Sequence, residues 1–170
     1  MPKEIIKTSG LKMMEIEKGT GSTPEVGQTV IAHYEIYFGE GTATSNYDYD
    51  NGTYIDELCD STYDESKPFF GPVDFVIGQE TPKDDLYKKG DSIKGLDEAF
   101  LSMKVGGKRK LIIPPELAYG AEGASSFHTF FRYRVPTNQP LFCTVELVAI
   151  KEQLEPKKNI KSSAPAYEAL

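Results

Sequence analysis

The side chains in this sequence that could carry out chemistry are few, and they form no familiar catalytic group. The two cysteines, Cys59 and Cys143, and the two histidines, His33 and His128, fit no zinc-binding spacing. Catalysis by a Ser-His-Asp or Cys-His arrangement needs a partnered histidine. His33 instead alternates with apolar residues in a β-rich run and is expected to be a strand residue. The sequence therefore predicts no metal site, no cofactor and no activated nucleophile.

Rotation about the peptide bond that precedes a proline is a reaction that needs none of these groups. Amide resonance opposes this rotation with a barrier of about 18–20 kcal/mol. The twisted transition state has lost that resonance and much of the amide dipole, so a dry apolar pocket favours it over the planar ground state. A few apolar side chains, a tyrosine hydroxyl aimed at the amide and one buried aspartate are sufficient for such a site.

Length and charge limit the class of protein. A chain of 170 residues suits one domain with a substantial core. A net charge of -7 argues against a nucleic-acid partner, and no apolar run approaches the roughly 20 residues that would insert across a membrane. Residues 1–8 have no apolar signal segment. We therefore expect a cytoplasmic location by default, with a processed organellar or extracytoplasmic form, for example in the thylakoid lumen, as the alternative.

Periodicity predicts an α+β fold. The helix is expected over residues 94–103, where Leu96, Ala99, Phe100 and Met103 form one apolar stripe. This helix would cover one face of an antiparallel sheet. Alternating β-branched and aromatic residues predict five strands for that sheet. The strands are expected at residues 11–17, 29–38, 72–78, 108–113 and 141–150.

The chain divides into one domain with flexible ends. Residues 1–10 are polar and are expected to be loose, residues 11–151 form the domain, and residues 152–170 form a polar tail. Residues 39–57 are rich in Gly, Asn and Asp and read as a long loop inserted in the domain. Loops of this length within a compact domain are usually functional or mobile.

Short motifs occur along this framework in a characteristic order. The longest is GKRKLIIPPELAYGAEG at 107–123; the others are VIAHY at 30–34, DST at 60–62, FVIG at 75–78, IKGL at 93–96 and VEL at 145–147. Together they resemble the FKBP-type peptidyl-prolyl cis-trans isomerases. This resemblance implies a twisted antiparallel five-stranded half-barrel wrapped around one short helix. It also implies catalysis of X-Pro rotation in protein folding, with proline-containing proteins or peptides as clients.

The resemblance further implies which residues form the site. Tyr119 would donate its hydroxyl to the amide before proline, and Tyr34 would form one wall with Asp60 at its rim. Taken alone, Tyr119 reads as a buried core tyrosine, and Asp60 equally as the cap of a turn. Six further positions would contact the substrate, Ile93 through its backbone N–H and Leu96 as the floor. They are Cys59, Val73, Phe75, Ile93, Leu96 and Cys143.

Two of these positions depart from the family pattern. Cys59 and Cys143 stand where aromatic residues are usual, which should weaken packing against a proline ring by about 1 kcal/mol or more. We therefore expect reduced activity, with a catalytically weak binding or assembly subunit as the alternative function. The resemblance makes the two cysteines neighbours, with Cα atoms about 4.4–6.8 Å apart, within reach of a disulfide. Two independent buried thiols are the other interpretation.

The segment at 124–136, which we call the flap, contains the run FHTFFRYRVP. Aromatic residues and arginine are enriched at protein interfaces, so the flap is one candidate surface for a protein partner. The other interpretation is a loop whose rings pack back on the domain. The C-terminal tail is a second candidate for partner binding.

Overall fold

The computed structural model describes most of the predicted domain and positions a single helix against a curled sheet. Residues 46–48, 53–55 and 58 are described by their backbone alone. The described residues are 3–38, 46–48, 53–55, 58–66, 70–78, 92–125, 129–131 and 134–152.

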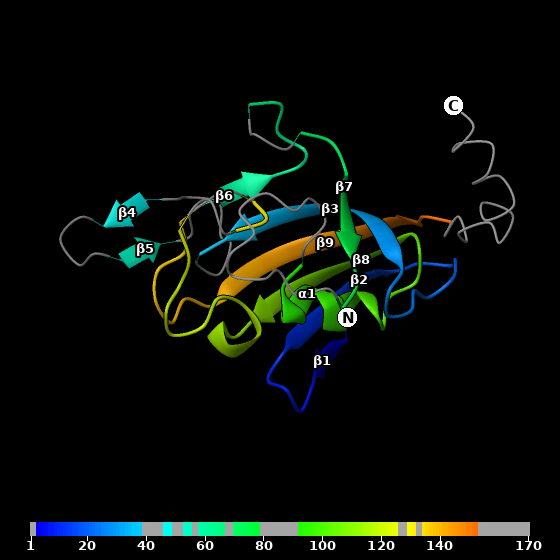
Figure 1. Cartoon of the computed structure of the whole chain (residues 1–170), viewed down its shortest axis with the longest axis horizontal. Helices are drawn as coiled ribbons and strands as arrows, with labels where there is room; N and C mark the ends of the chain where they lie inside the picture. The colour runs from blue at the N-terminus through cyan, green and yellow to red at the C-terminus, as the bar shows by residue number, and fades with distance from the viewer. Residues whose placement is uncertain are drawn as a thin grey trace, which may run out of the picture.

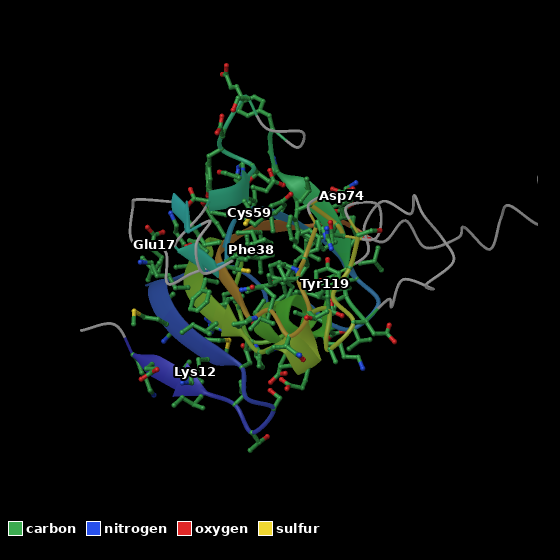
Figure 2. The ribbon with its side chains drawn as sticks, turned by 90° about the vertical axis from the view of Figure 1, so that its left-hand side faces the viewer. Lys12, Glu17, Phe38, Cys59, Asp74 and Tyr119 are labelled. Carbon is green, nitrogen blue, oxygen red and sulfur yellow. The ribbon has the colours of Figure 1, made fainter. Side chains whose placement is uncertain are left out.

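Seven strands form one antiparallel sheet in the order β1-β2-β8-β9-β3-β6, with β7 also paired to β3 (Figure 1). The strands are β1 (Glu4–Ile6), β2 (Lys12–Lys18), β3 (Thr29–Tyr37), β6 (Leu58–Ser61), β7 (Val73–Val76), β8 (Gly107–Ile113) and β9 (Leu141–Ile150). The remaining elements are a separate hairpin of β4 (Asn46–Asp48) and β5 (Thr53–Ile55), the helix α1 (Lys94–Phe100) and a 3-10 turn at Pro115–Leu117. Figure 2, turned by 90° from the view of Figure 1, shows that the sheet curls. Strands β1 and β2 lie toward one edge of it, and β6 and β7 toward the other.

The α+β class and the single helix are confirmed, but the sheet has seven strands where we expected five. Strand β1 lies in the stretch expected to be loose, and its three residues pair with β2. Strand β6 has only four residues. Three residues are below the length at which alternation can be recognised in a sequence, and four are at its lower limit. The expected 39–57 loop contains the β4–β5 hairpin, and its other residues lie outside the described part of the chain.

The core lies between the inner face of the sheet and α1. Strand β3 buries every second residue, and β9 does the same over most of its length. Their register places Tyr34 opposite Val145 and Ile36 opposite Cys143, so these side chains share one face. Across from them, α1 buries Leu96 among its apolar residues. The strongest strand patterns in the sequence thus form the centre of the sheet on which the helix packs.

The helix is shorter than its apolar stripe predicts. It ends at Phe100, and Met103, although buried, follows in turns closed by i to i−3 bonds. Ser102 donates its hydroxyl to the Ala99 carbonyl at 3.2 Å, which competes with a further helical turn. The buried guanidinium of Arg109 on β8 donates to the Ser102 hydroxyl and carbonyl oxygens at 2.6 and 2.9 Å. These bonds hold the end of the helix against the sheet.

Gly95 lets the first turn of α1 approach β8 closely. A Cβ atom at this position would lie 2.4 Å from Cγ2 of Ile113, which is fully buried. We predict that Gly95→Ala lowers the free energy of unfolding by about 1–3 kcal/mol, because this overlap outweighs the higher helix propensity of alanine. Urea unfolding followed by circular dichroism measures the change.

Removing the overlapping side chain provides the control for this prediction. In the double variant Gly95→Ala/Ile113→Ala the new methyl group has room, so its loss of stability should be smaller than the sum of the two single losses. Additive losses would show that the contact between Gly95 and Ile113 is not the cause.

Candidate active site

Tyr34 lies at a gap in the pairing of β3. On one edge of β3, β7 pairs with residues 29–32 and β6 with residues 35–37, which leaves Tyr34 between the two short strands. Thr62 fills this gap. The Tyr34 N–H donates to the Thr62 hydroxyl oxygen at 3.0 Å, and the Thr62 N–H donates to the Tyr34 carbonyl at 3.0 Å. Both backbone groups of Tyr34 are therefore satisfied where the ladder is interrupted.

A β-bulge brings Asp60 to the hydroxyl of Tyr34. The register between β3 and β6 shifts between Ile36 and Tyr37, so consecutive residues Cys59 and Asp60 are both buried. The Tyr34 hydroxyl donates to Asp60 Oδ2 at 2.7 Å, and the Ser61 N–H donates to Asp60 Oδ1 at 2.9 Å. Asp60 thus holds the turn and the phenol together.

The Tyr34 hydroxyl keeps its proton throughout the physiological pH range. Burial, followed by the hydrogen bond to Asp60, raises the pKa of Tyr34 far above its ordinary value. Tyr34 and Asp60 are each only 1% exposed. The pair is therefore a fixed donor–acceptor unit in apolar surroundings, in which the phenol keeps its proton and each side chain positions the other.

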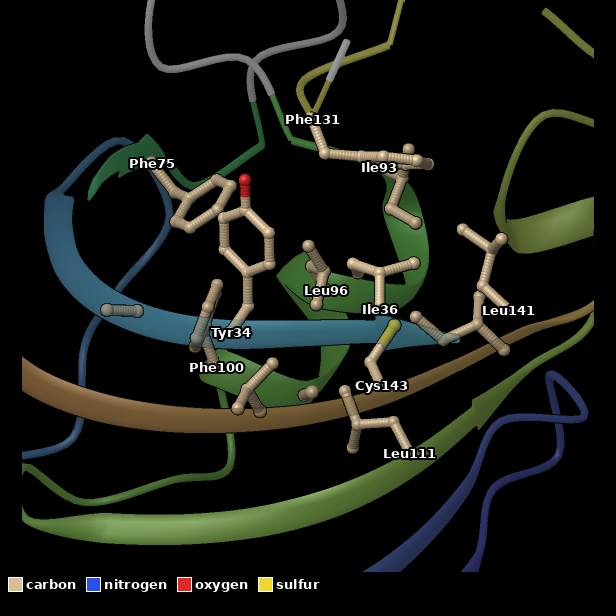
Figure 3. Packing of buried hydrophobic residues seen from close by; sticks show 14 of the residues in the cluster. Tyr34, Ile36, Phe75, Ile93, Leu96, Phe100, Leu111, Phe131, Leu141 and Cys143 are labelled. Carbon is tan, nitrogen blue, oxygen red and sulfur yellow. The ribbon is translucent and has the colours of Figure 1, made fainter. Parts of the chain in front are cut away.

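Apolar residues surround this pair. Phe75 lies edge-on to Tyr34, with ring centroids 6.1 Å apart, and Leu96 is fully buried on the helix beneath. Figure 3 shows Tyr34, Phe75, Leu96 and Ile93 directed into one region between β3 and α1. Val73 is half-buried on β7. Tyr34, the two β7 residues and the two residues at the start of α1 therefore come together from three separate stretches of the chain.

Tyr119 approaches from the loop after the 3-10 turn. Its ring is half-buried, and its hydroxyl oxygen accepts a hydrogen bond from the Phe130 N–H at 3.3 Å. Burial raises the pKa of Tyr119, and the donated N–H opposes this shift only partly. The hydroxyl is consequently a proton-bearing donor that faces the flap.

The flap supplies two aromatic rings that the site assignment did not include. The Phe130 ring lies edge-on to Tyr34 and Phe75, at centroid distances of 5.3 and 5.5 Å. Phe131 is 1% exposed and lies 6.4 Å from the Tyr119 ring. These two residues therefore pack back on the domain, whereas residues 126–128 and 132–133 lie outside the described residues. Their only signal in the sequence is the aromatic content of the flap.

Cys59 and Cys143 are both buried thiols. Cys143 lies opposite Ile36 on β3 and Leu111 on β8, on the inner face of the sheet. Burial, with the neighbouring Cys59 as the second cause, raises the pKa of the Cys143 thiol well above its ordinary value. The structure thus shows two thiols near one another, while a Cα separation within disulfide reach stays a prediction.

Two classes of feature are absent from the described residues. Within that part of the chain, no three His, Cys, Asp or Glu side chains are grouped so that they could hold a metal ion. None of its helices has the length and apolar character needed to cross a membrane.

The buried Tyr34–Asp60 pair lies among the apolar residues Phe75, Leu96 and Ile93. We call the surroundings formed by these residues the bowl. The family model described as FKBP-type peptidyl-prolyl cis-trans isomerase matches residues 20–148. The chain belongs to this family. It is thus a peptidyl-prolyl isomerase, of a family that acts on proline-containing peptides or proteins.

Individual FKBP relatives agree with this assignment. The chain is 34% identical over 143 residues to peptidyl-prolyl cis-trans isomerase Fkbp12 of Drosophila melanogaster, covering 84% of this chain and 99% of that protein. It is 33% identical to the chloroplastic isomerase FKBP16-3 of Arabidopsis thaliana, over 82% of this chain and 48% of that protein. The crystal structure of AtFKBP13 superposes with a TM-score of 0.57 at 29% identity, covering 88% of this chain and 99% of that one. The chain thus spans the full length of some relatives and about half of others.

Replacing Thr62 tests how the FKBP site is held together. We predict that Thr62→Val lowers the free energy of unfolding by about 1–3 kcal/mol, because it leaves the buried Tyr34 N–H without an acceptor while keeping the volume of the side chain. Thermal melts of Thr62→Val and of the control Thr62→Ser, which retains the hydroxyl, measure the effect. Equal losses in both variants would mean that the hydroxyl does not hold Tyr34.

The cysteines of this FKBP domain should be unreactive while it is folded. A buried thiol with a raised pKa forms little thiolate, so Ellman's reagent at pH 8 should label Cys143 far more slowly in the native chain than in urea. The Cys143→Ser variant identifies which signal belongs to this residue. Rapid native labelling of Cys143 would contradict its placement in the core.

Proposed function

We propose that this chain catalyses rotation about X-Pro bonds in protein clients through Tyr34, Asp60 and Tyr119. The observation that carries the proposal is the buried bond of 2.7 Å from the Tyr34 hydroxyl to Asp60, set among apolar side chains. The Tyr34–Asp60 bond gives a rigid wall, and the apolar side chains around it give a dry environment. Both favour a twisted, less polar amide over a planar one.

The proposed roles follow from where each group lies. Tyr34, fixed through its backbone and its hydroxyl, forms a wall for the proline ring. Tyr119 donates its hydroxyl to the carbonyl oxygen of the amide before proline. Asp60 acts by holding Tyr34 and by keeping the rim of the bowl polar. None of these steps transfers a proton to the client, because rotation breaks no covalent bond.

The remaining groups would bind the client. Leu96 forms the floor, and Val73 and Phe75 contribute the wall from β7. Ile93, the residue that precedes α1 and is in an extended conformation, would offer its backbone N–H to a client carbonyl. Cys59 and Cys143 would complete the lining.

A second function is favoured by one specific observation. The Phe130 ring packs on Tyr34 and Phe75, on the aromatic surface that a proline ring would contact. A site filled in this way suits a catalytically weak binding or assembly subunit, in which the flap or the C-terminal tail contacts a protein partner. The two functions differ in turnover, so a rate measurement separates them.

The client and the compartment are also matters of proposal. Clients would be proline-containing segments that are unfolded or extended enough to enter a bowl between strand and helix. The chloroplastic relatives support an organellar setting for this chain, such as the thylakoid lumen. A cytoplasmic setting is the alternative, and targeting of a fluorescent fusion would distinguish them.

The rate of isomerisation tests the role of Tyr119. In a protease-coupled assay on a Leu-Pro tetrapeptide, we predict that Tyr119→Phe lowers kcat/KM about tenfold, since one hydrogen bond to the twisted amide contributes about 1.4 kcal/mol. The matched control is Tyr63→Phe, which removes a hydroxyl that donates to Glu146 on the surface and should leave the rate unchanged.

Two outcomes would contradict the proposal. A wild-type rate in Tyr119→Phe would show that the hydroxyl takes no part in rotation. A folded wild-type chain with only the uncatalysed rate would favour the binding subunit over the isomerase.

A further inference from the structure

The Phe130 ring is packed among the residues to which the proposed function assigns the client's proline. Its centroid lies 5.3 Å from that of Tyr34 at 85°, and 5.5 Å from that of Phe75 at 78°. Edge-to-face contacts at these distances are favourable aromatic interactions. Tyr34 and Phe75 are almost completely buried, so a proline ring could not reach the same faces while Phe130 contacts them.

The backbone of Phe130 also contacts the proposed catalytic hydroxyl. Its N–H donates to the Tyr119 hydroxyl oxygen at 3.3 Å. This bond uses an acceptor lone pair of the Tyr119 oxygen, so it places the Phe130 backbone beside the hydroxyl while the hydroxyl keeps its own proton. One residue of the flap therefore engages both the proline-binding wall and the hydroxyl donor.

The neighbouring residues hold Phe130 in this position. Phe131 is buried and packs on Phe130, with centroids 5.0 Å apart. The base of the flap is closed by a bridge in which Ala124 and Val135 exchange two backbone hydrogen bonds, of 3.0 and 2.9 Å. With its base and its buried neighbour fixed, the flap presents the Phe130 ring to the bowl.

The two phenylalanines differ in a way that matters for access. Phe131 belongs to the core, whereas Phe130 is only half-buried. A core ring cannot leave without a cavity, but a half-buried ring can move outward by changing its rotamer and losing contacts on one side. Of these two phenylalanines, Phe130 is thus the one that can be displaced while the domain stays folded.

We propose that Phe130 is an internal occupant of the proline-binding bowl, which a client must displace before Tyr34 and Tyr119 can act on it. This inference rests on the proposed function and adds a control of access to it. Clients bind only the fraction of molecules in which Phe130 has moved out, so their apparent affinity is reduced by that fraction. The flap then selects clients whose own contacts compensate for the loss of the Phe130 contacts.

Truncating the ring tests the proposal. In Phe130→Ala, we expect kcat/KM for the Leu-Pro tetrapeptide to rise about tenfold, which corresponds to an open fraction of about one tenth in the wild type. The affinity for the same peptide, measured by NMR titration, should rise by a similar factor. Phe130→Leu, which keeps part of the apolar volume, should show a smaller gain in both measurements.

A matched control removes a phenylalanine ring elsewhere. Phe70 is 60% exposed in the loop before β7, so Phe70→Ala should leave rate and affinity at wild-type values. Circular dichroism melts of all variants report whether the fold is intact. If Phe130→Ala unfolds, the gain expected of Phe130→Leu decides the question.

The outcomes separate this inference from the proposed function. Unchanged or lower peptide affinity in folded Phe130 variants would overturn the inference, because it would make the ring a wall of the site and not a competitor. If affinity rises but no variant exceeds the uncatalysed rate, Phe130 is an occupant and the proposed catalytic roles are wrong. If both affinity and rate rise, both proposals are supported.

Discussion

The arrangement of the site depends on how the backbone of Tyr34 is satisfied at the gap between β6 and β7. A buried N–H and carbonyl without partners would be costly, and two strands that stop short of each other create that risk. Thr62 removes it by bonding to both groups. Two residues earlier, at the end of β6, the Asp60 carboxylate accepts a hydrogen bond from the Tyr34 hydroxyl. The segment from Asp60 to Thr62, at the end of β6 and just after it, therefore fixes both the backbone and the side chain of Tyr34.

Around this fixed pair, aromatic surface comes from the flap as well as from the sheet. The family resemblance places aromatic residues at positions 59 and 143, where this chain has buried thiols. Phe130 and Phe131 lie in the segment between β8 and β9, and their rings contact Tyr34 and Tyr119 respectively. A ring on a central strand cannot move independently of the sheet, whereas a half-buried ring on a loop can. Under the proposed displacement of Phe130, part of the aromatic surface around Tyr34 would respond to a client.

Much of the framework was predictable from local pattern. Alternation in β3 and β9 and the apolar stripe of Leu96 and Phe100 each follow the period of one element. Their burial follows because each side chain's face is set by its place in a period of 2 or 3.6 residues. β1 and β6 were not predicted, since β1 has only three residues and the pairing of both strands depends on a partner strand. The helix ended before its apolar stripe because the Ser102 hydroxyl bonds to the Ala99 carbonyl and Arg109 on the next strand bonds to Ser102.

By itself the sequence determined the family and the central strands and helix, because these are recorded in residue type and spacing. Only the tertiary structure decided that Thr62 satisfies Tyr34, that a bulge buries Cys59 and Asp60 side by side, and that Phe130 lies among the rings of the bowl. Each of these features is a contact between segments separated by 20 or more residues or a shift in strand register. Such contacts depend on the relative position of whole elements, which no local pattern of residues specifies.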